Sequence, residues 1–279
     1  QSQRTMRQLR LQAMQRGVIA VLDIGTFKVA CLILKFGSSD GPREGSGVGA
    51  MAGQATFRVI GAGTTRSRGV RFGEIAAMQE TERAVRTALQ TAQKMAQTRV
   101  DHAILCFSGG DMRSYGLEGT VDIAGAQVSE DDIANVLDAC DVPDLGNGRE
   151  VLHAQPVNFM LDHRNGLADP RGQAGRRLGC DMHLLSVDAN AVQNLAHCLK
   201  RCDVEVAGLA AAPYMSGRSA LVEDEQELGA AAIDLGGGST SLSIFIKKHM
   251  IYADTVRLGG DHITGDIAKG LQIPYSTAE

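Results

Sequence analysis

The chain lacks several features that would place it in whole classes of protein. Its 279 residues carry a formal net charge of −4, so there is no overall electrostatic attraction to nucleic acid. No run reaches the roughly 18 consecutive apolar residues that a membrane-spanning helix needs, and no secretory leader is visible. We therefore expect a cytoplasmic protein, whose 44% hydrophobic residues suffice for a sizeable core.

Metal-ligand patterns are also lacking. The six cysteines are scattered and include no C-x-x-C pair. Cys198 and Cys202 lie one helical turn apart, but two thiols without a nearby second pair make a poor zinc site. The spacing of His153, His163 and His183 fits no single-face ligand pattern. Reduced, mostly buried thiols and structural histidines are the favoured interpretation.

What the sequence does contain is one motif in two copies, each a strand, an Asp-x-Gly turn and a second strand. The first copy is Asp23-Ile24-Gly25-Thr26, flanked by Val18–Leu22 and Val29–Phe36; the second runs from Asp234 to Thr240, flanked by Ala230–Ile233 and Leu242–Ile246. Glycines at a hairpin tip let backbone N–H groups approach phosphate oxygens, because no Cβ is in the way. Such turns are common without any ligand, but their paired occurrence favours a duplicated clamp for the phosphates of ATP.

Each copy also contributes an aspartate, and a carboxylate beside phosphate would repel it directly. Its natural role is to hold a hydrated Mg²⁺ that bridges the phosphates. Asp23 and Asp234 are therefore the candidate catalytic and metal-shell residues, with Mg²⁺ bound mainly through water. The candidate phosphate-binding residues are Gly25, Thr26, Gly236, Gly237, Gly238, Ser239 and Thr240.

With these motifs the chain resembles the actin, Hsp70 and sugar-kinase superfamily, in which each half contributes one phosphate hairpin. Within it the chain is most similar to the FtsA family of bacterial cell-division proteins. The resemblance extends over nearly all of Val18–Glu279 and is carried by Val21–Ala30, Glu223–Gly229 and the more specific Leu258–Ala268. It implies ATP and Mg²⁺ as cofactors and adds Phe27, Lys28, Gly259 and Gly260 to the expected nucleotide site.

The order of elements predicts an α/β fold with duplicated actin-like, ribonuclease H-type halves. We expect strand Phe57–Ala62, helix Gly73–Gln97, strand Ala103–Phe107, and later helix Ala189–Arg201 and strand Val204–Ala210. Between them lies an α+β insert, similar to the SHS2-like subdomain 1C of FtsA. Its expected elements are strand Thr120–Val128, a helix opened by the capping-box variant Ser129-Glu130-Asp131-Asp132, and strands Val151–Leu161 and Leu178–Val187. Actin places its extra subdomain in a gap that here spans only Gly63–Gly73, which is too short to hold one.

We accordingly expect a basic flexible extension (1–16), a discontinuous subdomain 1A (17–108 plus 182–212), the insert 1C (109–181) and the start of the second half, 2A (213–279). That second half is expected to be incomplete, since a later Gly-rich adenine motif cannot fit after Asp266–Glu279. For Gln1–Arg16, a disordered extension is favoured over a basic helical arm on an anionic membrane. Gly37–Gly53, rich in glycine and serine, is predicted to be a long flexible hairpin loop.

The resemblance implies a protein that polymerises into filaments and tethers FtsZ to the cytoplasmic face of the inner membrane at the division site. In the family, a C-terminal amphipathic helix absent from this chain makes the membrane contact. It also implies that the insert binds other proteins, with Arg164, Arg171, Arg176 and Arg177 forming either a solvated loop or a contact surface. Nucleic acid is not an expected partner.

Catalysis is expected to be weak. Relatives place a Glu or Gln that orients the attacking water after strand Val204–Ala210, but no carboxylate or carboxamide occurs from Ala207 to Leu221. The chain is therefore at most a slow ATPase. Two alternatives are an FtsA-like scaffold protein of pilus assembly, which shares the insert, and a small-molecule kinase, which would need a catalytic carboxylate beside a substrate pocket.

Overall fold

The computed structural model describes residues 3–37 and 56–279, and the chain divides into two compact units. Unit 1 consists of Gln1–Phe107 and Gln193–Ala210, and unit 2 of Ser108–Val192 and Ala211–Glu279. The loop predicted over Gly37–Gly53 lies outside the described residues, apart from Gly37 itself. Within the described ranges, no helix combines the length and the apolar character needed to cross a bilayer.

Unit 1 is built on a five-stranded sheet in the order β11-β6-β1-β2-β3. Its strands are β1 (Val18–Ile24), β2 (Lys28–Gly37), β3 (Thr56–Arg66), β6 (His102–Phe107) and β11 (Glu205–Ala211). β2 pairs antiparallel with both β1 and β3, whereas β6 pairs parallel with β1. This mixed sheet is the one expected for a ribonuclease H-type half.

Helix α2 (Met78–Ala96) lies directly on the backbone of β3. A Cβ on Gly61 would come within 2.3 Å of the Ala92 carbonyl oxygen, and one on Gly63 within 2.2 Å of that of Ala88, so only glycine permits this approach. The helix starts at Met78 rather than at the predicted Gly73, because β4 (Val70–Arg71) and β5 (Glu74–Ile75) pair as a short hairpin first. No subdomain is inserted between β3 and α2, as the short gap predicts.

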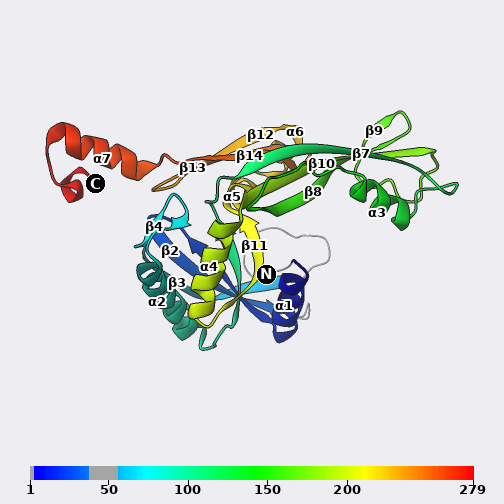
Figure 1. Cartoon of the computed structure of the whole chain (residues 1–279). Coiled ribbons are helices and arrows are strands. Elements are labelled where there is room, and N and C mark those ends of the chain that lie inside the picture. The colour runs from blue at the N-terminus through cyan, green and yellow to red at the C-terminus, as the bar shows by residue number, and fades with distance from the viewer. Residues whose placement is uncertain (1–2, 38–55) are drawn as a thin grey trace. The chain divides into compact units, whose positions relative to one another are not determined.

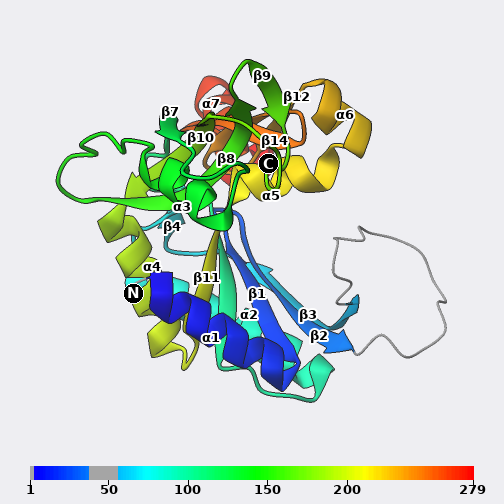
Figure 2. The same cartoon turned by 90° about the vertical axis from the view of Figure 1, so that its right-hand side faces the viewer.

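Helix α1 (Gln3–Arg16) occupies the segment for which the sequence favours a disordered extension. Ala13 is buried with Ile19 and Ala207, and Leu9 packs against the same cluster. α1 and α2 flank the five-stranded sheet on its two sides (Figures 1 and 2). Leu9 and Ala13, spaced i and i+4, give the helix an apolar stripe that the sheet covers, and this contact explains why the segment is helical.

The insert in unit 2 forms an antiparallel sheet in the order β7-β10-β8-β9, made of β7 (Arg113–Asp122), β8 (Arg149–Leu161), β9 (Arg164–Leu167) and β10 (Arg177–Asp188). Helix α3 (Glu130–Asp138) packs on it. The Ser129 hydroxyl accepts from the Asp132 N–H at 3.2 Å, and the Asp132 carboxylate accepts from the Ser129 N–H at 2.9 Å, which confirms the predicted capping box. The strand predicted over Thr120–Val128 is correct only as far as Asp122.

The rest of unit 2 contains a second antiparallel sheet of β12 (Ala230–Leu235), β13 (Thr240–Ile246) and β14 (His249–Val256). Helix α4 (Ala189–Arg201), whose predicted bounds are confirmed, runs from unit 2 into unit 1. After β11 come α5 (Ala212–Ala220) and α6 (Glu223–Leu228), and after β14 come α7 (Gly260–Leu271) and α8 (Tyr275–Ala278). Figure 1 shows α7 continuing beyond the end of this sheet.

The two sheets of unit 2 are joined through Ser114 on β7. Its hydroxyl accepts from the Ala253 N–H at 2.8 Å and donates to the Ala253 carbonyl at 2.7 Å, so one side chain satisfies both backbone groups of a residue on β14. Because a hydroxyl has one proton, His183 must be the donor in its 3.0 Å contact with Ser114, through Nε2–H. Burial lowers the pKa of His183 to about 4, so its ring is neutral at pH 7.

Candidate functional site

The first predicted hairpin is the β1–β2 turn of unit 1. Asp23 lies opposite Ala30 near the end of the ladder. The Gly25 N–H donates to the Lys28 carbonyl at 3.0 Å and closes the turn, which leaves Thr26 and Phe27 at the tip. Within the described chain, the N–H groups of Thr26 and Phe27 donate to no other residue. The structure thus brings Gly25, Thr26, Phe27 and Lys28 together at one turn.

This first turn is supported by β3 and the residues that follow it. The Ser67 N–H donates to the Phe27 carbonyl at 2.9 Å. The guanidinium carbon of Arg66 lies 5.7 Å from the centre of the Phe27 ring, a cation–π contact on a half-exposed side chain. A long 3.5 Å bond joins the Gly73 N–H to Thr26 Oγ1. The tip therefore has a single short hydrogen bond to the segment that supports it.

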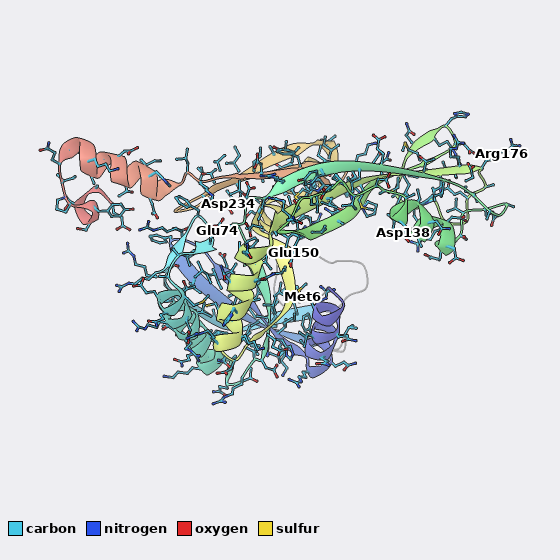
Figure 3. The ribbon with its side chains drawn as sticks, viewed as in Figure 1. Met6, Glu74, Asp138, Glu150, Arg176 and Asp234 are labelled. Atoms are coloured by element: carbon cyan, nitrogen blue, oxygen red, sulfur yellow. The ribbon has the colours of Figure 1, made fainter. Side chains whose placement is uncertain are left out.

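The second predicted hairpin is the β12–β13 turn of unit 2. Asp234, labelled in Figure 3, pairs with Ser241 near the end of β12. The Gly236 N–H donates to the Ser239 carbonyl at 2.9 Å and closes the turn. The three successive N–H groups of Gly237, Gly238 and Ser239 donate to no other group in the part of the chain that the structure describes. Such a run of unpaired N–H groups is the arrangement that binds anions.

The start of α7 packs directly against this second turn. The Gly260 N–H donates to the Gly236 carbonyl at 2.9 Å, and the Asp261 N–H donates to the Gly237 carbonyl at 2.8 Å. A Cβ on Gly259 would come within 2.5 Å of both carbonyl oxygens, so the close approach requires glycine there. Gly259 and Gly260 thus lie against the backbone of the hairpin. Their predicted contact with a nucleotide stays a prediction.

A side chain that sequence reasoning missed also reaches this hairpin. Ser216 on α5 donates its hydroxyl to Asp234 Oδ2 at 2.6 Å. The available signal was Gly217, because a glycine inside a helix is unfavourable unless a neighbouring element packs closely against it. The Asp234 carboxylate is therefore held by a helix that lies before it in the sequence.

The described residues hold no group of three or more His, Cys, Asp or Glu side chains able to bind one metal ion. Two of the three histidines considered as ligands have structural partners: His153 Nε2 accepts from the Ala211 N–H at 3.2 Å, and His183 donates to the Ser114 hydroxyl at 3.0 Å. His163 is exposed. All six cysteines are free, and burial raises the pKa of Cys31 to about 11 and that of Cys180 to about 12. These two thiols are protonated at pH 7, as expected for buried, reduced cysteines.

The arginine-rich turn of the insert is partly paired within the chain. Arg171 forms ion pairs with Asp169 and Glu130, and Arg177 forms one with Asp122. These side chains are exposed, so the pairs contribute little to stability. The structure thus ties two of the four arginines to the insert's own acids, and a role in protein contacts stays a prediction.

Comparison with known proteins decides the family. The family described as "SHS2 domain inserted in FTSA" matches residues 109–186, and the family described as "Cell division protein FtsA" matches residues 231–279. Over 263 residues the chain is 41% identical to the cell division protein FtsA of Rhizobium meliloti (strain 1021). This alignment covers 94% of this chain and 58% of that relative. The chain belongs to the FtsA family.

Another FtsA, from Agrobacterium fabrum (strain C58), is 38% identical over 270 residues, which covers 96% of this chain and 60% of that protein. The chain therefore spans about three-fifths of the length of these curated FtsA relatives. Among solved structures, the PilM-PilN type IV pilus biogenesis complex matches with a TM-score of 0.60 at 13% identity, covering 93% of this chain and 67% of that one. At this identity the likeness shows the fold alone, and with the family match it confirms the predicted actin-like fold with an SHS2 insert.

Proposed function

We propose that this FtsA-family chain is an actin-like cell-division protein that binds ATP through its two glycine hairpins. The observation that carries the proposal is the run of unpaired N–H groups at Gly237, Gly238 and Ser239, directly after the Asp234 strand. The matching turn at Gly25 ends with the unpaired N–H groups of Thr26 and Phe27. Both turns therefore present backbone donors of the kind that bind phosphate oxygens.

Magnesium fits the residues present. Mg²⁺ binds proteins through one or two carboxylates, water and substrate phosphates rather than through an all-protein cage, and each hairpin offers one aspartate. When bound, the ion neutralises charge on the phosphates. Asp23 and Asp234 would hold its water molecules, while the unpaired N–H groups of the two turns would hold the phosphate oxygens. Since α5 carries no carboxylate or carboxamide to orient a water molecule, hydrolysis is expected to be slow.

The family also suggests what the protein assembles with. We propose filament formation and tethering of FtsZ to the cytoplasmic face of the inner membrane, the membrane contact being made by the C-terminal helix of the family. The named relatives support division over pilus assembly, because the FtsA of R. meliloti is 41% identical and the PilM-PilN structure only 13%. The described chain shows no signal for a small-molecule kinase beyond the shared hairpins.

The clamp is tested by Asp23→Ala and Asp234→Ala. Each change removes one charged contact to the hydrated metal and should weaken Mg-ATP binding by about 1–3 kcal/mol, measured by isothermal titration calorimetry on the purified protein. Asp138→Ala is the matched control, because Asp138 is an exposed aspartate at the end of α3 (Figure 3). Affinity equal to the control in both hairpin variants would remove the clamp assignment.

A further inference from the structure

The bond between Ser216 and Asp234 joins α5 to the metal-shell aspartate of the second hairpin. Its length of 2.6 Å is that of a charge-assisted O–H to carboxylate bond. In the described chain, Ser216 is the only hydrogen-bond partner of the Asp234 carboxylate. One oxygen, Oδ2, is therefore held by the helix, and the other is left to interact outside it.

The approach of α5 to the sheet depends on the residue after Ser216. A Cβ on Gly217 would lie 2.3 Å from Cε2 of Phe245 and 2.7 Å from Oγ of Ser243, both buried on β13. Glycine at this position thus lets the helix lie against the strand that follows the hairpin. The two neighbouring residues thus act together. Gly217 lets α5 approach β13, and Ser216 binds the Asp234 carboxylate.

A carboxylate that is fixed before the ligand arrives loses less conformational freedom on binding and presents its open oxygen in one direction. We propose that Ser216 is a positioning residue, which holds the Asp234 carboxylate in the orientation that binds the hydrated Mg²⁺ of a nucleotide. The inference rests on the proposed function, because Ser216 has this role only if Asp234 belongs to the Mg-ATP clamp. Ser216 itself would touch neither phosphate nor metal, because its hydroxyl is bonded to Asp234.

The test compares Ser216→Ala with Ser219→Ala, an exposed serine on the same helix. Titration calorimetry with Mg-ATP should show about a 3- to 10-fold loss of affinity for Ser216→Ala and none for Ser219→Ala. When a chelator replaces Mg²⁺, Ser216→Ala should bind ATP as the unmodified protein does, because Ser216 acts only through the aspartate that holds the metal. A purely structural defect would instead lower the affinity both with and without Mg²⁺. Ser216→Thr keeps the hydroxyl and should bind Mg-ATP as the unmodified protein does.

A double variant separates this inference from the proposed function. Asp234→Asn should weaken Mg-ATP binding, and adding Ser216→Ala to it should cause no further loss, since the serine acts through the aspartate. Unchanged affinity in Asp234→Asn would overturn the proposed clamp. Two results would overturn the positioning role alone. In the first, Asp234→Asn weakens Mg-ATP binding but Ser216→Ala binds as tightly as the unmodified protein. In the second, the losses of the two single variants add in the double variant. Should Ser216→Ala fail to fold, Ser216→Cys offers a side chain of similar size and a weak donor for the same comparison.

Discussion

The turn between β1 and β2 and the turn between β12 and β13 close with the same bond, from the Gly25 N–H to the Lys28 carbonyl and from the Gly236 N–H to the Ser239 carbonyl. Their supports differ. Short backbone bonds from Gly260 and Asp261 hold the second turn, whereas the first receives one short backbone bond. The same motif is thus packed tightly in unit 2 and more openly in unit 1.

The difference shows that the motif determines the conformation of the turn itself. The contacts that hold the turn in place come from other segments of the chain. At the second turn the supporting groups are the backbone of residues 258–261 and the hydroxyl of Ser216. At the first, they are the segment after β3 and the exposed ring of Phe27. Substitutions that test packing should therefore cost more at the second hairpin.

Gly259→Ala should have the largest effect. Its Cβ would meet two backbone oxygens at 2.5 Å, which cannot move without separating α7 from the turn, and the expected loss is about 3 kcal/mol of unfolding free energy. Gly265→Ala is the control in the same helix, because its Cβ would meet open space. This variant should raise the unfolding free energy by about 0.5–1 kcal/mol. Denaturant unfolding without nucleotide measures both, and hydrogen exchange at the Gly260 and Asp261 amides locates the change. Equal stability of the two variants would contradict the tight packing described.

A direct comparison of the turns comes from Gly236→Ala and Gly25→Ala. The added Cβ would lie 2.8 Å from the Ser239 carbonyl oxygen in the second turn, but 3.2 Å from the Lys28 carbonyl oxygen in the first. The Gly236 variant should lose about 1–2 kcal/mol, and the Gly25 variant less, because its neighbour needs to shift only slightly. The measurement is again denaturant unfolding without nucleotide. A greater loss in the Gly25 variant would reverse the comparison.

The smallest expected difference lies in the hydroxyls. Thr240 Oγ1 donates to the Leu258 carbonyl at 2.7 Å, while Thr26 Oγ1 accepts at the long distance of 3.5 Å. Thr240→Val should therefore cost about 0.5–1 kcal/mol, and Thr26→Val only a few tenths. Thermal unfolding of both variants without nucleotide checks this order. Similar losses would mean that Thr26 makes a stronger bond in solution than its distance indicates.

Sequence patterns were reliable where the controlling interactions are local. The bounds of α4 and the capping box at Ser129 follow from the spacing of apolar residues and from an acid placed three residues after a serine. Patterns were less reliable where contacts with a distant segment decide the local structure. The predicted start of α2 was wrong, because β4 and β5 pair before the helix begins. The prediction of a disordered extension was wrong because Leu9 and Ala13 of α1 pack on the sheet.

By itself, the sequence determined the two hairpins, since an aspartate, a glycine turn and two β-rich strands lie within a few residues of each other and require only local backbone pairing. Only the tertiary structure decided what holds the second hairpin. Gly259 and Gly236 are 23 positions apart, and Ser216 precedes Asp234 by 18, so no local periodicity links them. Their contacts exist because glycines without a Cβ let α5 and α7 come close to the strands, and this closeness is a property of packed elements rather than of any short stretch of chain.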